Sequence, residues 1–363
     1  MGDGEIMKRK KKKSLAIALA AVTVLASVLT GCTNAKETGG NNVESTSGTQ
    51  GASAESITIT NVSYDPTREL YASYNKLFAE HYKEETGIDV TIEQSHGGSG
   101  SQARSVVEGT EADVVTLALA HDITSIEEAG MIEKDWLSEF DKNSSPYTST
   151  IVFLVRSGNE KNIKDWDDLI KDGVEVITPD PKSSGGACWN FLAAWAFAGN
   201  LYNNDEAQQK EFMSKLYNNV SVMDSGARGA TSTFVENGQG DVLIAWENEA
   251  LLSVQEHPDE YEIVTPSISI LAEPSVAIVD SVVDAHGTRD VAKAYLEYLY
   301  SDDAQKLAGE SFYRPSNETI LKEFSDTFDL NINLVTIDDF GGWDQAYADF
   351  FVDGGIFDEI YDK

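Results

Sequence analysis

Three short segments rich in glycine and serine are the parts of this chain whose composition could do chemistry. Their sequences are HGGSGSQ (96–102), KSSGGAC (182–188) and DSGARGA (224–230). Glycine lacks a Cβ and leaves backbone N–H groups open to a ligand, and a helix start carries about half a positive charge. Such segments could therefore bind an anion. Taken alone, such a segment is better explained as an ordinary capped turn, but several of them together favour a shared anion site.

A fourth segment, YDPTREL (64–70), places Asp65 and Pro66 at an expected helix N-cap and first helical position. Enzyme motifs are missing: the glycine segments lack the Lys-Ser/Thr of a P-loop, and no nucleophile elbow, zincin or EF-hand pattern occurs. Residues 98–103 fit a loose dinucleotide pattern, but the next strand does not end in an acidic residue. An enzyme using a phosphorylated or dinucleotide substrate stays an alternative to anion binding.

The elements that would position these segments alternate between strands and helices. Helical spacing predicts long helices at 69–87 and 290–310. Apolar or alternating runs predict strands at 57–63, 89–95, 112–120, 151–157, 174–180 and 241–247. This order indicates an α/β fold with a largely parallel sheet, in which ligands bind beyond the carboxyl ends of the strands. A length of 363 residues suggests two lobes.

The N-terminal region has the pattern of a secreted and anchored protein. A basic run (8–13) precedes an apolar stretch (15–30) that is shorter than a membrane span. The stretch ends in LTGC, similar to the lipobox of bacterial lipoproteins. We therefore expect residues 1–31 to be a signal peptide, Cys32 to carry lipid and the polar residues 32–55 to form a flexible tether. A plain signal peptide with an incidental cysteine is the alternative.

Charge and cysteine content narrow the function further. The formal net charge is −34, which disfavours binding to nucleic acid or anionic lipid. It still permits an anionic ligand, because charges beyond about 8 Å are largely screened at physiological salt. With Cys32 lipidated, Cys188 has no partner for a disulfide. We expect no metal and no cofactor.

These segments, with others in the same order, resemble the periplasmic sulfate-binding proteins of the sulfate/thiosulfate ABC importer. The similarity extends over about residues 57–358 and includes NVSYDPTRELY (61–71), QSHGGSG (94–100), ADVVTLALA (112–120), SPYTSTIVFLVR (145–156), ITPDPKSSGGA (177–187), DSGARGATSTFVE (224–236), GDVLIAWENEALL (240–252), SILAEPSVAIVD (269–280) and FYRPSNE (312–318).

The resemblance implies a type II periplasmic-binding-protein fold, in which each lobe is an α/β sheet flanked by helices and the ligand lies in the interlobe cleft. The corresponding regions would be lobe 1 (56–140 and 250–300), lobe 2 (141–249) and a C-terminal helical segment (301–363) packing on the lobes. The resemblance also implies which groups hold sulfate: the backbone N–H groups of Ser99, Ser184, Gly185, Gly186 and Ala227, the Ser184 hydroxyl and the Trp246 indole N–H.

Asp65 and Arg228 would support these loops from behind. Without the resemblance, Trp246 would be interpreted as a core residue. Ser101 and Cys188 stand where relatives often carry Lys and Arg. The positive charge that relatives have at the entrance of the site is therefore not expected from these two positions. A buried, inert Cys188 is the expectation.

The implied function is that of a monomeric, extracytoplasmic, lipid-anchored receptor that binds sulfate without breaking a bond and delivers it to an ABC permease. A site made of donors suits a fully deprotonated anion. A protonated phosphate would leave its P–OH without an acceptor, at a cost of about 1–3 kcal/mol. Thiosulfate, molybdate and phosphate remain alternative ligands, and a purely structural surface lipoprotein is the alternative without a ligand.

Overall fold

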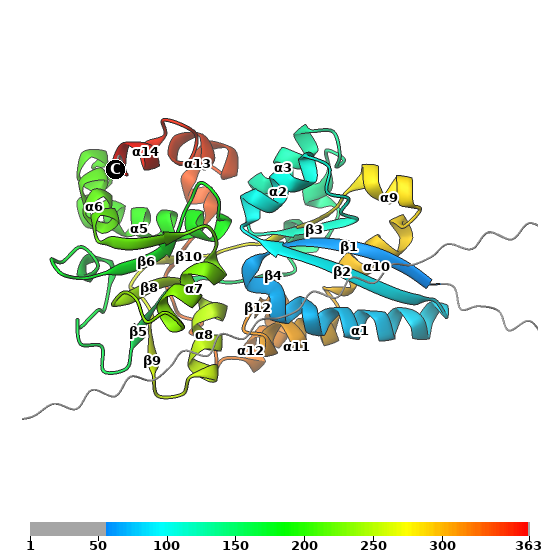
Figure 1. Cartoon of the computed structure of the whole chain (residues 1–363), viewed down its shortest axis with the longest axis horizontal. Coiled ribbons are helices and arrows are strands. Elements are labelled where there is room, and N and C mark those ends of the chain that lie inside the picture. Colours follow the sequence, from blue (N-terminus) through cyan, green and yellow to red (C-terminus); the bar gives the residue numbers. More distant parts are fainter. Residues whose placement is uncertain (1–55, 362–363) are drawn as a thin grey trace, which may run out of the picture. The chain divides into compact units, whose positions relative to one another are not determined.

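The computed structural model of the chain describes residues 56–361. The signal peptide, the lipidation of Cys32 and the tether that the sequence predicts all lie outside this range. The described strands form two main sheets, of four and five strands, and two small two-stranded sheets (Figure 1). None of the described helices is both long and apolar enough to cross a membrane.

The first main sheet is covered by helices on both faces. Its strands, in the order β11-β3-β1-β2, are β1 (Ser56–Tyr64), β2 (Asp89–Gly97), β3 (Val114–Leu117) and β11 (Ser275–Ile278). Its helices are α1 (Arg68–Thr86), α2 (Ser99–Val107), α3 (Ala120–Glu128), α9 (Asp280–His286) and α10 (Arg289–Tyr298). Ile59 packs with Phe78 of α1, and Val62 packs on the other face with Val106 of α2. This alternation follows from the two-residue period of a strand.

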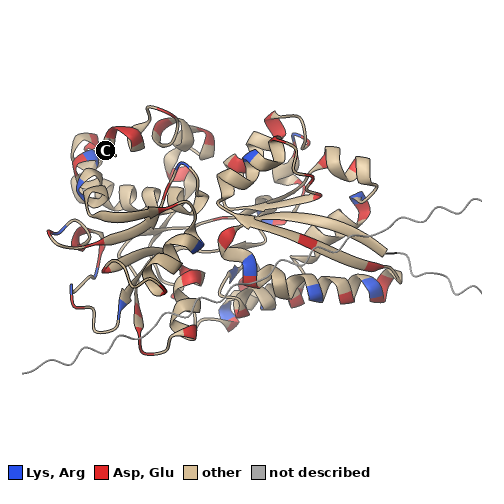
Figure 2. Cartoon of the chain, in the orientation of Figure 1, with Lys and Arg blue, Asp and Glu red and all other residues tan. Residues whose placement is uncertain are grey.

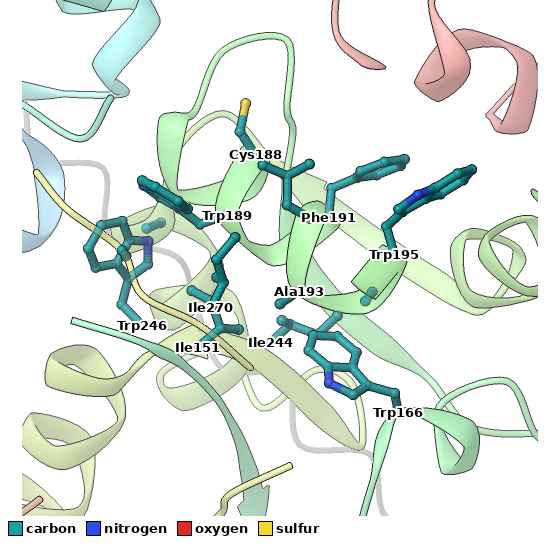
Figure 3. Packing of buried hydrophobic residues seen from close by; sticks show 14 of the residues in the cluster. Ile151, Trp166, Cys188, Trp189, Phe191, Ala193, Trp195, Ile244, Trp246 and Ile270 are labelled. Atoms are coloured by element: carbon teal, nitrogen blue, oxygen red, sulfur yellow. The ribbon is translucent and has the colours of Figure 1, made fainter. Parts of the chain in front are cut away.

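The second main sheet also has two covered faces. Its strands, in the order β7-β6-β8-β5-β9, are β5 (Ile151–Arg156), β6 (Val176–Pro179), β7 (Val220–Asp224), β8 (Val242–Trp246) and β9 (Tyr261–Val264). Its helices are α5 (Gly185–Tyr202), α7 (Ala227–Val235) and α8 (Glu247–Glu256). Figure 3 shows Ala193 of α5 beside Ile244 of the strands. Phe191 and Trp195 lie on the other side of the helix, where both contact Phe350 of α13 (Trp343–Phe350). Phe234 of α7 covers the opposite face of the sheet.

Shorter elements complete the chain. The small sheets pair β4 (Tyr147–Thr148) with β12 (Arg314–Pro315) and β10 (Ser269–Ile270) with β13 (Leu334–Val335). The remaining helices and turns are η1 (Asp65–Thr67), η2 (Trp136–Ser138), α4 (Asp141–Ser144), η3 (Trp166–Asp168), α6 (Glu206–Asn218), α11 (Asp302–Glu310), α12 (Glu318–Glu323), η4 (Ile337–Phe340), α13 (Trp343–Phe350) and α14 (Ile356–Ile360).

Two segments that connect the main sheets are joined to each other by hydrogen bonds. The chain passes from the first sheet to the second between β3 and β5 and returns between β9 and β11. The Ser149 amide donates to the Ala272 carbonyl oxygen at 2.9 Å, and the Thr150 hydroxyl donates to the Ser269 hydroxyl at 2.8 Å. The connection is therefore a paired structure rather than two separate loops.

Two sequence expectations differ from the structure. The helix predicted over 290–310 is two helices, α10 and α11, because the Ser301 hydroxyl accepts from the Ala304 amide and starts a new helix. Asp65 does not cap a helix but begins the turn η1, and Tyr64 takes the cap position. The predicted largely parallel arrangement agrees with the parallel pairs of β1 with β2 and β3 and of β6 with β7 and β8, while β11 and the pairs formed by β5 are antiparallel.

One predicted lobe boundary disagrees with the pairing of the strands. A second lobe ending at residue 249 would leave β9 in the first lobe, whereas β9 pairs with β5 in the second sheet. A strand at 261–264 was not expected from the sequence, which explains why the boundary was set too early. The other boundaries of the two lobes stay a prediction.

A buried ion pair fixes the start of α8 to the segment around β12. Arg314 contacts Glu247 through two hydrogen bonds of 2.6 and 2.8 Å, and both side chains are buried. We expect Arg314→Met to lower the free energy of unfolding by about 3–5 kcal/mol, because Glu247 is left buried without its partner. Urea unfolding of this variant and of the double variant with Glu247→Met measures the effect. The double variant should recover most of the loss, and an equal loss in both would contradict the explanation.

Candidate functional site

The starts of three helices meet around one small cavity. The first residues of α2, α5 and α7 follow the carboxyl ends of β2, β6 and β7, where the sequence predicted a ligand. The space between the lining atoms is about 170 Å³, part of which is open to solvent. Its lining consists of Tyr64, Asp65, Pro66, Gly97, Gly98, Ser99, Ser184, Gly186 and Ala227.

Four backbone amides at these helix starts are free to donate to a ligand. In the described range, no protein atom accepts a hydrogen bond from the amides of Ser99, Gly185, Gly186 or Ala227. The first amides of a helix have no acceptor within the helix, and the helix dipole makes their surroundings positive. The arrangement therefore offers an anion several N–H groups without a cationic side chain among the residues that line the cavity.

Ser184 differs from the prediction in one of its two donors. Its amide donates to the Asp180 carbonyl oxygen at 2.8 Å, so the loop itself already uses this N–H group. Its side chain lines the cavity and does not cap α5. The hydroxyl of Ser184 therefore remains as the donor that this residue can offer.

Trp246 brings a buried, unpaired donor to the side of the cavity. The residue is 1% exposed, and its indole N–H has no hydrogen-bond partner. The indole nitrogen lies against Gly186, where an added Cβ would collide with it. Together with Ala227 it lines a second small void. Gly186, which the indole nitrogen contacts, is part of the lining of the first cavity, whereas Trp246 itself is not.

Ser99 is held by a carboxyl group that the sequence analysis missed. Its hydroxyl donates to Asp122 of α3 and accepts from the Ala118 amide at 3.0 Å. Ser99 can therefore offer its amide but not its hydroxyl. Burial raises the pKa of Asp122 to about 6, although the Ser99 hydroxyl and Arg104 lower it. The 23 positions between Ser99 and Asp122 left no local signal of this contact.

Asp65 lies closer to the cavity than predicted. It was expected to support the loops from behind, but its side chain is part of the lining. One carboxylate oxygen is 3.8 Å from Arg68, and the other lies against Gly226. Burial raises the pKa of Asp65, while Arg68 and Arg228 oppose this shift.

Arg228 connects elements of the two sheets. Its guanidinium donates to Glu69 of α1 at 2.6 Å and lies 3.0 Å from Glu249 of α8. Burial disfavours its charge, but Glu249 and Glu69 together raise the pKa of Arg228. The arginine therefore stays charged, and its contact with Glu69 joins α7 of the second sheet to α1 of the first.

Two further contacts join the loops of the first sheet to the helices and loops of the second. The Trp189 indole of α5 donates to the Ala118 carbonyl oxygen after β3 at 3.0 Å. Gly98 faces the loops of the second sheet so closely that a Cβ there would lie 2.6 Å from the Ser183 carbonyl oxygen and 2.8 Å from that of Ser225. The structure thus shows the two halves of the site in contact.

Ser101 and Cys188, the two positions that differ from relatives with Lys and Arg, carry neutral side chains. The Ser101 hydroxyl accepts from Arg104 at 3.1 Å. Cys188 is a buried, free cysteine whose thiol donates to the Pro181 carbonyl oxygen at 3.4 Å, and burial raises its pKa. Acidic side chains are spread over many elements, as expected from 61 Asp and Glu against 27 Lys and Arg in the chain (Figure 2).

Comparison with known sequences gives long matches. A family model described as bacterial extracellular solute-binding protein matches residues 62–314. The sulfate-binding protein of Escherichia coli strain K12 is 59% identical over 309 residues, covering 85% of this chain and 94% of that protein. The thiosulfate-binding protein of Pseudomonas aeruginosa is 45% identical over 315 residues, covering 86% and 94%.

Solved structures agree with the fold. The sulfate-binding protein SubI from Mycobacterium tuberculosis H37Rv matches with a TM-score of 0.74 and 34% identity, covering 81% of this chain and 99% of that one. The periplasmic binding protein AfuA of Actinobacillus pleuropneumoniae matches with a TM-score of 0.61 at 18% identity, covering 80% and 96%, which concerns the fold alone. The predicted α/β periplasmic-binding-protein fold is confirmed.

Proposed function

The chain belongs to the family of bacterial extracellular solute-binding proteins, and from this we propose that it binds sulfate in the cavity at the starts of α2, α5 and α7. As a member of this family it is extracytoplasmic. The single observation that carries the choice of ligand class is the group of unpaired amides at Ser99, Gly185, Gly186 and Ala227, which converge without a lining Lys or Arg. Amides and hydroxyls donate hydrogen bonds, so they suit an oxyanion that carries no proton.

The donors come from separate parts of the fold, and this supports a closing mechanism. The Ser99 amide belongs to a helix of the first sheet, and the other amides belong to helices of the second. Sulfate held by both sets favours the arrangement in which they are close together, because only there can all of them reach it. The contacts of Arg228 with Glu69 and of Trp189 with Ala118 stabilise the same arrangement.

Trp246 and Ser184 complete the proposed donor set. The Ser184 hydroxyl lines the cavity, and the Trp246 indole N–H is buried beside it without a partner. A buried donor without a partner costs about 1–3 kcal/mol, which a ligand oxygen would recover. Sulfate binding therefore gives this indole the acceptor that the protein does not supply.

The steps that surround binding are part of the same proposal. Cys32 would carry the lipid that anchors the protein to the membrane, and residues 32–55 would act as the tether. The closed, sulfate-bound monomer would be the form that an ABC permease accepts. No covalent chemistry is involved, because the protein holds its ligand and releases it unchanged.

A proton-bearing oxyanion is a second candidate, and Asp65 is the observation that favours it. Asp65 lines the cavity, and a carboxylate could accept the hydrogen bond of a phosphate P–OH. Against this, Asp65 is a single carboxylate, while the amides of Ser99, Gly186 and Ala227 in the same lining are unpaired donors. Sulfate therefore fits the remaining donors better than phosphate does.

Calorimetric titration at fixed ionic strength tests the ligand. We expect sulfate to bind at least about 10⁴-fold more tightly than phosphate, because the pairing of buried polar groups discriminates by this order. Thiosulfate and molybdate are titrated in parallel. Asp65→Asn is the diagnostic variant: a sulfate site keeps or gains affinity, whereas a phosphate site loses it. Tighter binding of phosphate than of sulfate by the wild type would contradict the proposal.

A further inference from the structure

Asn248 is a buried polar residue in the first turn of α8, two positions after the proposed sulfate donor Trp246. The residue is 3% exposed. Its side-chain amide nitrogen donates to the Pro66 carbonyl oxygen at 3.3 Å and to the Tyr313 hydroxyl at 3.0 Å. Neither acceptor belongs to the second sheet or to the helices that cover it. Asn248 therefore connects the start of α8 to other parts of the fold.

The bond to Pro66 crosses from the second sheet to the first. Pro66 lies in η1, directly after β1, and is part of the lining of the proposed sulfate cavity. Asn248 thus holds this part of the lining to the helix start that carries Trp246. A hydrogen bond between two bodies that move apart exists only while they are together. The bond therefore belongs to the arrangement in which the donors of both sheets reach one anion.

The bond to Tyr313 joins the same side chain to the segment between the sheets. Tyr313 directly precedes β12, which pairs with β4 in the connection from the first sheet to the second. The rings of Tyr313 and Tyr147 of β4 pack with centroids 4.8 Å apart. The Tyr147 hydroxyl forms a 3.0 Å hydrogen bond with the Tyr71 hydroxyl of α1. Asn248 is thus where α8 meets both the first sheet and the connection between the sheets.

We propose that Asn248 is a positioning residue for sulfate binding, which holds Trp246 and the first sheet's part of the cavity together and thereby slows release of the anion. The inference rests on the proposed function and deepens it. Asn248 is not part of the cavity lining, so it acts through Trp246 and Pro66 rather than on the ligand. Because its bond to Pro66 forms only on closing, it affects the dissociation rate and not the first encounter with sulfate.

Asn190 of α5 offers a matched control within the second sheet and its helices. It is 2% exposed, and its side-chain amide nitrogen also donates two hydrogen bonds, to the Thr178 hydroxyl and the Ile244 carbonyl oxygen, both at 3.1 Å. In both asparagines the side-chain oxygen has no hydrogen-bond partner among the described residues. The difference lies in where the bonds lead, because the partners of Asn190 are in β6 and β8 of the second sheet.

Asn248→Ala and Asn190→Ala in the full chain, titrated with sodium sulfate, separate the two roles. We expect Asn248→Ala to bind sulfate about tenfold more weakly, which is the order of one lost hydrogen bond. Stopped-flow tryptophan fluorescence should show faster dissociation, with the association rate within about twofold of the wild type. Asn190→Ala should keep its affinity within about threefold. It should lower the midpoint of urea unfolding without sulfate more than Asn248→Ala does, because its two bonds do not depend on closing.

Failure of this inference and failure of the proposed function give different results. If Asn248→Ala binds and releases sulfate as the wild type does, or loses affinity only through slower association, the positioning role is overturned and sulfate binding stays intact. Absence of any heat or thermal shift when the wild type is titrated with sulfate overturns both. Asn248→Leu, which lacks the donor but fills the space, gives the same test if the alanine variant does not fold.

Discussion

Trp246→Phe is expected to weaken sulfate binding by about 10–100-fold, since it removes one hydrogen bond to a charged ligand, worth about 1.5–3 kcal/mol. The variant keeps an aromatic ring against Tyr64, whose ring centroid is 5.3 Å from that of Trp246. It also removes a buried N–H group that has no partner in the described structure. The loss of affinity should therefore exceed any loss of stability, as measured by calorimetry and by urea unfolding without sulfate.

Trp166→Phe is the matched control for this prediction. Trp166 is also fully buried, but its indole N–H donates to the Ile268 carbonyl oxygen at 2.8 Å. Its replacement leaves that carbonyl without its donor and should lower the free energy of unfolding by about 1–3 kcal/mol. Sulfate affinity should stay at the wild-type level. If both variants lose stability and keep affinity, Trp246 is a core residue and not a donor.

The contrast between these tryptophans shows where sequence reasoning ends. Both side chains are buried in the same hydrophobic cluster, and nothing local in either segment tells whether the indole N–H has an acceptor. The acceptor of Trp166 is 102 positions away, so only the folded chain decides the matter. Family resemblance was needed to single out Trp246, and the structure adds that its N–H is unpaired.

The glycine segments were easier to predict, because their signal is local. A strand followed by small residues and a helix was enough to place the amides of Gly185 and Gly186 at the start of α5. The use of the Ser184 amide by Asp180 and the contact of Asp122 with Ser99 could not be predicted, since both depend on loop geometry. These contacts decide which atoms remain available to a ligand.

The same distinction holds for the fold. The six strands predicted from apolar runs are present within a few residues, and α1 matches its predicted bounds closely. Strands β7, β9 and β11, of five, four and four residues, were not predicted. Apolar runs this short are ambiguous between strand and helix, and β3 and β6, which are equally short, lie within longer predicted runs. In each main sheet one strand runs against the others, β11 in the first and β5 in the second, and a direction of this kind cannot be predicted from the residues of the strand itself.

Gly98→Ala is expected to weaken sulfate binding by more than about 100-fold, because the added methyl group prevents the two halves of the site from meeting. Its Cβ would lie 2.6 and 2.8 Å from two backbone carbonyl oxygens, those of Ser183 and Ser225. Backbone atoms move less readily than a side-chain end, so the loops would have to separate. Calorimetry measures the affinity, and urea unfolding without sulfate should show little change, since the separated arrangement has room for the methyl group.

Gly100→Ala separates this steric effect from a general effect of alanine at the start of α2. A Cβ there meets its nearest neighbours at 3.5 Å and the Ser183 carbonyl oxygen at 3.7 Å, which are ordinary contacts. Alanine favours a helix over glycine by about 1 kcal/mol, so stability should rise slightly and affinity should stay within about threefold. Equal affinities for the two variants would mean that sulfate is bound while Gly98 and the Ser183 loop stand apart. The donors of the two sheets would then not act on one ligand.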